Sequence, residues 1–239
     1  MNKLYEEYND VVNMVKDYIR QEQLDGVKDI ASVVSERKEE VSLSKDALLD
    51  ELSAGVSACR KCSLGKSRIK AVFGDGNPDA ELVFVGEGPG YDEDRQGLPF
   101  VGRAGQLLTK IIEAIDMKRP DVYIANIVKC HPMKDPSSPD KRGNDRPPTQ
   151  DEANTCKPFL FKQIEIIQPK IVCALGTYSA QLLLNTKQSI GSLRGRFYDA
   201  SGIKIMPTLH PASCLYQASN KKYVWADMKM IRDELKRMK

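Results

Sequence analysis

The sequence of 239 residues has no apolar run of transmembrane length, and its first residues lack the apolar core of a signal peptide. It contains no internal repeat, and its only biased tract is a charged stretch at residues 35–40. These absences argue against a membrane-spanning, secreted or repeat protein. We therefore expect a cytoplasmic protein without a membrane partner.

Charge and cysteine content narrow the function only slightly. The formal net charge is +3, which permits nucleic-acid binding without requiring it. In a reducing compartment, the six cysteines indicate metal ligands or buried apolar residues rather than disulfides. With 41% hydrophobic residues, the chain can build one substantial domain and a smaller appendage.

Short apolar runs alternate with segments of helical spacing along most of the chain. The runs predict core strands near residues 82–85, 121–130, 170–176 and 203–209. A helical segment follows each strand, and a capping box at Thr149 and Glu152 starts one of these helices. The alternation predicts a three-layer α/β/α fold around a central, mainly parallel four-stranded sheet.

The first part of the chain has a different pattern. Apolar residues recur with helical spacing over residues 4–19 and again over residues 48–56. We therefore predict a helical N-terminal extension over residues 1–50 and an α/β domain over residues 51–239.

The stretch at residues 82–108 concentrates features that suit a ligand pocket. Its buried strand ends in Gly86-Glu87-Gly88-Pro89-Gly90, where glycines let backbone N–H groups approach a ligand closely. Phe100 and a helix beginning near Gln106 follow, and the N-terminus of that helix would point to the same place. Open α/β sheets bind ligands at the carboxyl ends of their strands, so we expect the pocket there.

Two polar residues at other strand ends would face the same edge of the sheet. Asn126 lies near the end of the second predicted strand, and His210 follows the fourth. Each has an ordinary alternative, a turn hydrogen bond for Asn126 and a structural role for His210. Likewise, Phe100 alone suits the core and Glu87 alone suits a helix N-terminus. A shared position at one sheet edge favours a functional site.

Four cysteines could converge on one centre. Cys59 and Cys62 form a CxxC pair, and Cys130 and Cys156 lie at the ends of other elements. Four thiolates suit zinc or an iron–sulfur cluster, which spacing alone does not separate, and unrelated free thiols are the alternative.

Taken in order, these motifs resemble the iron–sulfur uracil-DNA glycosylases known as family 4. The resemblance covers about residues 59–235. The matching residues are Gly86-Glu87-Gly88-Pro89-Gly90, Glu93-Asp94, Gly97, Pro99-Phe100-Val101-Gly102, Ala104-Gly105, Leu107-Leu108, Asn126-Ile127-Val128-Lys129-Cys130, Glu152, Cys156-Lys157-Pro158, Gln163, Pro169 and His210-Pro211-Ala212. It implies a 4Fe–4S cluster held by the four cysteines, which shapes the fold and the DNA-binding loops.

The resemblance also implies how a uracil base would be read. Phe100 would stack on the extruded base, and Asn126 would hydrogen-bond its O4 and N3–H. Glu93 would crowd C5 and exclude the thymine methyl group. His210 would donate to O2 as negative charge develops on the leaving base.

Further expectations concern the sugar and the DNA. Gly86 and Gly88 would lie against the substrate, and Glu87 would orient the attacking water or support the cationic sugar. Better-known uracil glycosylases carry an aspartate where this chain has Gly88. Leu215 would fill the gap left by the flipped nucleotide.

The resemblance therefore implies a monofunctional glycosylase, acting as a monomer, that releases uracil from DNA for base-excision repair. The loop between Cys130 and Cys156 has no histidine where a related group carries a nucleophile, which favours hydrolysis. The alternative is a non-catalytic iron–sulfur module that binds DNA. Residues 1–50 fall outside the resemblance and could contact a repair or replication protein.

Overall fold

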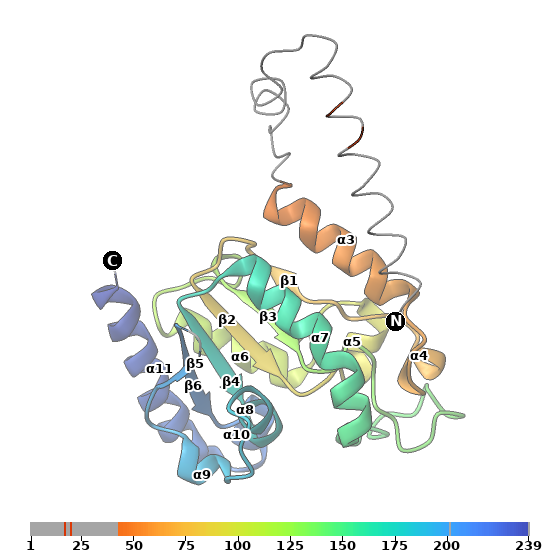
Figure 1. Ribbon diagram of the computed structural model, residues 1–239. Helices are drawn as coiled ribbons and strands as arrows, with labels where there is room; N and C mark the ends of the chain where they lie inside the picture. The colour runs from red at the N-terminus through yellow and green to blue at the C-terminus, as the bar shows by residue number, and fades with distance from the viewer. Residues whose placement is uncertain (1–16, 18–19, 21–42, 201, 239) are drawn as a thin grey trace. The chain divides into compact units, whose positions relative to one another are not determined.

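The computed structural model describes residues 17, 20, 43–200 and 202–238. Ser44–Lys239 forms one compact unit (Figure 1). The helix expected at residues 4–19 falls almost wholly outside the described residues. Among the helices that are described, none combines the length and apolar character needed to cross a membrane.

A six-stranded sheet forms the centre of this unit, in the order β1-β3-β2-β4-β6-β5. The four inner strands are parallel, as predicted, and comprise β3 (Tyr123–Asn126), β2 (Leu82–Gly86), β4 (Ile171–Leu175) and β6 (Ile203–Thr208). The edges are the antiparallel strands β1 (Asp75–Gly76) and β5 (Tyr198–Ala200). With only two residues, β1 has no apolar run that sequence could reveal.

Helices connect and cover the strands. The longer ones are α3 (Lys45–Ala58), α6 (Arg103–Glu113), α7 (Gln150–Ile167) and α11 (Lys221–Arg237). The shorter ones are α4 (Leu64–Ser67), α5 (Tyr91–Gln96), α8 (Thr177–Leu183), α9 (Ile190–Leu193) and α10 (Pro211–Tyr216), with 3-10 turns η1 (Arg119–Asp121) and η2 (Ala218–Asn220). Several of these short helices carry the residues of the candidate site.

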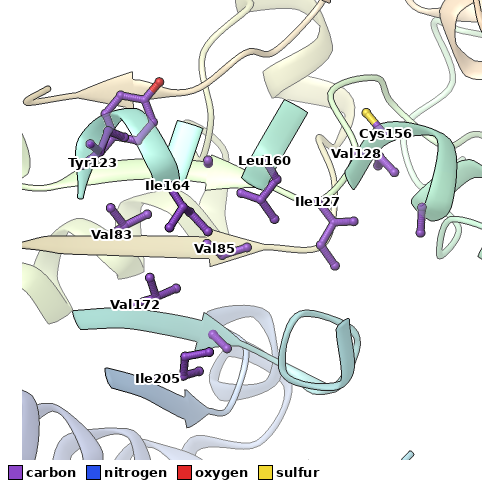
Figure 2. Close-up of a cluster of buried hydrophobic side chains, with 14 of the residues drawn as sticks. Val83, Val85, Tyr123, Ile127, Val128, Cys156, Leu160, Ile164, Val172 and Ile205 are labelled. Atoms are coloured by element: carbon purple, nitrogen blue, oxygen red, sulfur yellow. The ribbon is translucent and has the colours of Figure 1, made fainter. Parts of the chain in front are cut away.

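Alternate residues of the inner strands face two separate cores, as a sheet covered on both faces requires. On one face, Val83 and Val85 of β2 pack with Leu160 and Ile164 of α7, which Figure 2 shows close together. On the other face, Phe84 packs with residues of α6 and α11. In Figure 1, α7 lies in front of the sheet and α6 behind it. These layers leave the carboxyl ends of the strands free to build a site.

The predicted domain boundary at residues 50 and 51 falls inside α3. Leu49 and Val56, on either side of it, are both buried in the α/β unit. Lys45 also donates a hydrogen bond to the Ile167 carbonyl at the end of α7. The compact unit accordingly begins at Ser44, several residues before the predicted boundary.

The start of α7 is held by the predicted capping box. The Thr149 hydroxyl accepts from the Glu152 N–H, and the Glu152 carboxylate accepts from the Thr149 N–H. Arg146 forms two further hydrogen bonds to that carboxylate, at 2.7 and 2.8 Å, and lowers the pKa of Glu152 to about 2. Pro158 lies inside the helix without ending it.

We expect Glu152→Gln to lower the free energy of unfolding at pH 7 by about 1.5–3 kcal/mol, because it weakens hydrogen bonds to a charged group that is only 6% exposed. The folded-state pKa lies below the unfolded one. The difference between wild type and variant should therefore shrink as the pH falls from the unfolded pKa toward 2. Urea unfolding at several pH values measures it. Glu165→Gln on the same helix breaks only an exposed pair with Lys162 and should cost less than about 0.5 kcal/mol.

Candidate active site

A cavity of about 520 Å³ opens where β2, β3 and β6 end. Six residues predicted from the sequence line it, namely Gly88, Glu93, Phe100, Asn126, His210 and Leu215. They come from the turn after β2, from α5, from the segment before α6, from the end of β3 and from α10 with its cap. Parallel strands bring these distant segments together, because their carboxyl ends share one edge of the sheet.

Asn126 offers an unused hydrogen-bond acceptor to this cavity. It is the last residue of β3 and is 1% exposed. Its side-chain Oδ1 is buried and has no hydrogen-bond partner. A buried polar atom without a partner is costly, so a ligand that donates a hydrogen bond to this atom would be favoured.

Gly86 permits the close approach of Asn126 and Phe100. A Cβ atom at Gly86 would lie 2.3 Å from the Asn126 Oδ1 and 2.5 Å from the Phe100 Cζ. Any other residue would therefore push one of these side chains out of place. Gly86 itself supports the two side chains and does not form the cavity wall.

Phe100 is held in a backbone conformation that side chains rarely adopt. Its φ angle is +52°, in the left-handed region, and the residue is only 7% exposed. The start of α6 packs against its backbone so tightly that a Cβ at Gly105 would lie 1.9 Å from the Phe100 carbonyl oxygen. The ring centroid lies 5.7 Å from that of His210, with the planes inclined by 32°. The strain is stored in a residue that faces the cavity.

Glu93 clamps the segment that carries Phe100. One carboxylate oxygen accepts hydrogen bonds from the N–H groups of Val101 and Gly102, both at 2.9 Å. The other accepts from the Gly90 N–H at 3.2 Å. The carboxylate thus ties the glycine turn to the strained loop, in addition to lining the cavity. Its expected contact with C5 of a base stays a prediction.

His210 presents a neutral imidazole with one defined donor. Its Nδ1 accepts a hydrogen bond from the Ala212 N–H at 3.2 Å, because His210 caps the N-terminus of α10. Burial lowers the pKa of His210 to about 4, so the ring is uncharged at neutral pH. With Nδ1 acting as acceptor, the proton of the neutral ring is on Nε2.

Glu87 lies next to the cavity rather than in its wall. It is partly buried, and this burial raises the pKa of its carboxyl group. The neighbouring Gly88 does line the cavity, but a Cβ there would lie 2.7 Å from the Val128 Cγ2. A carboxylate side chain at position 88 therefore does not fit without moving Val128.

Two side chains project at the rim of the cavity. Leu215, predicted to enter the DNA, is 40% exposed, and the adjacent Tyr216 is 92% exposed. Sequence reasoning missed Tyr216, although an aromatic residue directly after Leu215 was a usable signal. An exposed apolar pair at a pocket mouth is suited to contact the bases of a nucleic acid.

The long loop after β3 adds a wall that sequence reasoning also missed. Arg142 forms a double hydrogen bond with Asp92 and stacks 4.3 Å from the Tyr91 ring centroid. All three residues line the cavity. The loop is anchored by Asp145, which also lines the cavity and lies 2.7 Å from the His131 Nε2. The basic loop and Tyr91 between the motif residues were the available signals.

The four cysteines of the predicted centre lie near one another. Burial raises the pKa of Cys156, and the thiols of Cys62 and Cys59 raise it further. Burial likewise raises the pKa of Cys130 to about 11, with added effects from Cys156 and Cys62. The Arg68 Nη1 donates a hydrogen bond to the Cys130 sulfur at 3.0 Å.

No three His, Cys, Asp or Glu side chains in the described part of the chain are close enough to hold one metal ion. The remaining thiols, Cys173 and Cys214, are buried and belong to the other core.

Comparison with known proteins gives a consistent family. Residues 73–229 match the family model described as "Uracil DNA glycosylase superfamily". A type-4 uracil-DNA glycosylase of Saccharolobus solfataricus is 43% identical over 196 residues, covering 78% of this chain and 86% of that protein. One from Thermotoga maritima is 42% identical over 179 residues, covering 74% and 88%. One from Archaeoglobus fulgidus is 38% identical over 191 residues, covering 77% and 91%.

The pKa values of the two histidines should depart from the ordinary histidine value in opposite directions. We expect His210 to stay neutral with its proton on Nε2 until the pH falls to about 4. Burial alone would lower the pKa of His131, but the carboxylates of Asp145 and Asp94 raise it to about 9. Imidazole ¹⁵N NMR of wild type, assigned with His210→Gln, measures both. Two histidines that titrate together near pH 6.5 would contradict this geometry.

Proposed function

The chain belongs to the uracil-DNA glycosylase superfamily, and from this membership and the cavity we propose that it hydrolyses the bond between uracil and deoxyribose in DNA. The products would be free uracil and an abasic site. The observation that carries the proposal is the unpaired Asn126 Oδ1, placed in the same cavity as the neutral His210. Uracil has a donor and acceptors that match these two groups.

Base selection follows from the Asn126 amide. Its Oδ1 would accept the uracil N3–H, and its Nδ2 would donate to O4. Cytosine has no proton at N3 and has an amino group in place of O4, so the buried amide would face groups of the wrong polarity. Sites that hydrogen-bond their substrate in this way reject analogues strongly. The Phe100 ring, fixed by its strained backbone, would support the face of the base.

When the bond to the sugar breaks, the base departs with the bonding electrons and carries a negative charge that must be stabilised. The His210 Nε2–H would donate to the uracil O2, and because the ring is already neutral it needs no prior loss of a proton. A preorganised donor aimed at developing charge is among the strongest contributions to catalysis. Glu87, whose pKa burial raises, would orient the water or stabilise the positive sugar.

DNA would bind across the cavity mouth. Extruding a nucleotide from the duplex costs a few kcal/mol, and a side chain inserted into the gap offsets part of this cost. Leu215 is our candidate for that role, because it is exposed at the rim, in a helix whose cap is His210 itself. One short helix thus couples base extrusion to the donor on the base.

The neighbouring thiols of Cys59, Cys62, Cys130 and Cys156 would hold a 4Fe–4S cluster. Their chemistry fits, since such clusters are bound by four cysteine thiolates. A zinc ion draws its ligands into one tight tetrahedron, whereas a four-iron cluster spaces its thiolates farther apart. The likeness to the type-4 enzymes favours the cluster, and the effect of Cys59 and Cys62 on the pKa of Cys156 supports the proximity of the thiols that a cluster needs. Bound there, it would join α7 and the segment after β3 to the α3–α4 turn.

A non-catalytic DNA-binding module on the same fold is the alternative. Against it stands the polarity of the cavity, because a module that only grips the backbone has no need for a buried unpaired amide oxygen. A hydrolytic enzyme uses that atom directly.

We expect the iron-loaded protein to release uracil from an oligonucleotide, with thymine and hypoxanthine strands left intact. His210→Ala should lower the single-turnover rate by roughly a hundred- to a thousandfold, because it removes the donor to the leaving base. Asn126→Ala should lower it at least about tenfold. Glu87→Gln should lower it by about a hundredfold and flatten its fall at acidic pH. Alkali cleavage of the product strand followed by electrophoresis measures each rate.

Asn154→Ala is the matched control, because Asn154 bonds only Gln150 on the exposed face of α7. Its rate should equal that of wild type. If wild type releases no uracil, the proposed enzyme activity is contradicted and the DNA-binding module is favoured. If Asn126→Ala and His210→Ala keep the wild-type rate, the uracil pocket is not at this cavity.

The cluster has its own test. The purified protein should be brown, with iron and sulfide in the ratio of a 4Fe–4S cluster. Cys130→Ser should lose most of the iron and unfold at a lower temperature, whereas Cys214→Ala, at a buried cysteine of the other core, should keep it. Metal analysis and the absorbance of the sulfur-to-iron charge-transfer bands measure cluster binding in each variant. A colourless protein with bound zinc would refute the cluster.

A further inference from the structure

Lys129 is a buried cation whose position the uracil pocket alone does not explain. It lies between Asn126 and Cys130 in sequence and is 1% exposed. Fully buried lysines are rare unless a partner compensates their charge. The side chain therefore needs both hydrogen-bond acceptors and a counter-charge.

Two neutral oxygens accept from the Lys129 ammonium. One is the main-chain carbonyl of Asn126, 2.8 Å from the Nζ, and the other is the Gln163 Oε1 at 2.5 Å. Gln163 is itself fixed, since its Nε2 donates to the Phe73 carbonyl and to the Tyr123 hydroxyl. Lys129 thus spans from α7 to the end of the strand that presents the Asn126 side chain to the cavity.

The groups next to Lys129 that can carry a negative charge are the sulfurs of Cys130 and Cys156. Among the described residues, no Asp or Glu forms an ion pair with Lys129. The Lys129 main-chain N–H donates to the Cys156 sulfur at 3.3 Å, and Cys130 is the next residue in the chain. Burial lowers the pKa of Lys129 to about 7, and the nearby Cys156 and Cys130 oppose this shift. As free thiols these residues would be neutral, and as cluster ligands they are anionic.

We propose that Lys129 is a positioning residue that joins the iron–sulfur centre to the base-reading amide. Its ammonium balances the negative charge of the Cys130 and Cys156 thiolates. Its hydrogen bond to the Asn126 carbonyl fixes the strand end from which the amide reads uracil. This inference rests on the proposed function and on the proposed cluster.

The proposal explains how a cluster outside the base pocket contributes to excision. Held by Cys130 and Cys156, the cluster would fix the segment that carries Lys129, and the Lys129 ammonium would fix the Asn126 carbonyl. Loss of either should disturb the alignment of the amide with the base rather than the chemistry at the sugar.

Lys129→Met tests both roles, because methionine preserves most of the length and removes the charge and the hydrogen bonds. The reduction potential of the cluster should become more negative, since the ammonium that stabilised the added electron is lost. A lysine with a packing role alone would leave the potential unchanged. Redox titration followed by electron paramagnetic resonance measures it, with Lys162→Met, an exposed lysine on α7, as the control that keeps the wild-type potential.

A double-mutant cycle tests the link to Asn126. In the wild-type background, Lys129→Met should lower kcat/KM for uracil release about tenfold or more. In the Asn126→Ala background, the same change should cost little further, because the side chain that Lys129 positions is already absent. Independent, multiplicative losses would overturn the link, and an unchanged potential would overturn the charge balance.

Other outcomes also decide. If Lys129→Met binds no cluster, Lys129→Arg keeps the positive charge, and cluster binding by that variant supports the charge role while its absence overturns it. If wild type releases no uracil, the proposed function and the link to Asn126 fail together. The reduction potential then still determines whether Lys129 balances the cluster.

Discussion

The site depends on one close approach, that of Asn126 and Phe100 across Gly86. No Cβ fits between them, and the Asn126 Oδ1 is buried there without a partner. A ligand that donates to this atom would recover the free energy that is lost while it is unpaired. The left-handed backbone of Phe100 and the three-amide clamp of Glu93 exist to hold this arrangement. A strained backbone at Phe100 and an unpaired buried acceptor at Asn126 therefore lie at the same cavity.

The inner strands and the helices that cover them were predictable, because burial gives their apolar residues a regular spacing in the sequence. The inner strands are apolar on both faces, so a continuous run such as that of β2 reveals them. The membership of Asn126, Phe100 and His210 in one site was also predictable, since strand ends share an edge. β1, with two residues, has no comparable pattern and was not predicted. The start of α3 at Lys45 has no such pattern either, and the predicted helix begins three residues later.

What sequence could not provide are properties that arise from contacts between distant segments. Burial lowers the pKa of His210 to about 4. The Ala212 N–H donates to Nδ1, so the neutral ring carries its proton on Nε2. The ion pair between Arg142 and Asp92 joins residues fifty positions apart. Glu93 was expected to touch the base, yet most of its acceptor capacity is used by backbone N–H groups. Such roles depend on which distant residues a loop contacts in the folded chain, and the local sequence pattern does not contain this information.

The absence of a carboxylate at position 88 has a steric reason. Val128, two residues before Cys130, occupies the space that a Cβ at Gly88 would need, and Val128 is itself fully buried in the core beside Cys156 (Figure 2). The packing of Val128 thus leaves no room for an aspartate side chain at position 88 of the glycine turn. Glu87, with a pKa raised by burial, is the neighbouring acid that the turn retains. The packing beside Cys156 and the place of the acid in the turn therefore depend on the same valine.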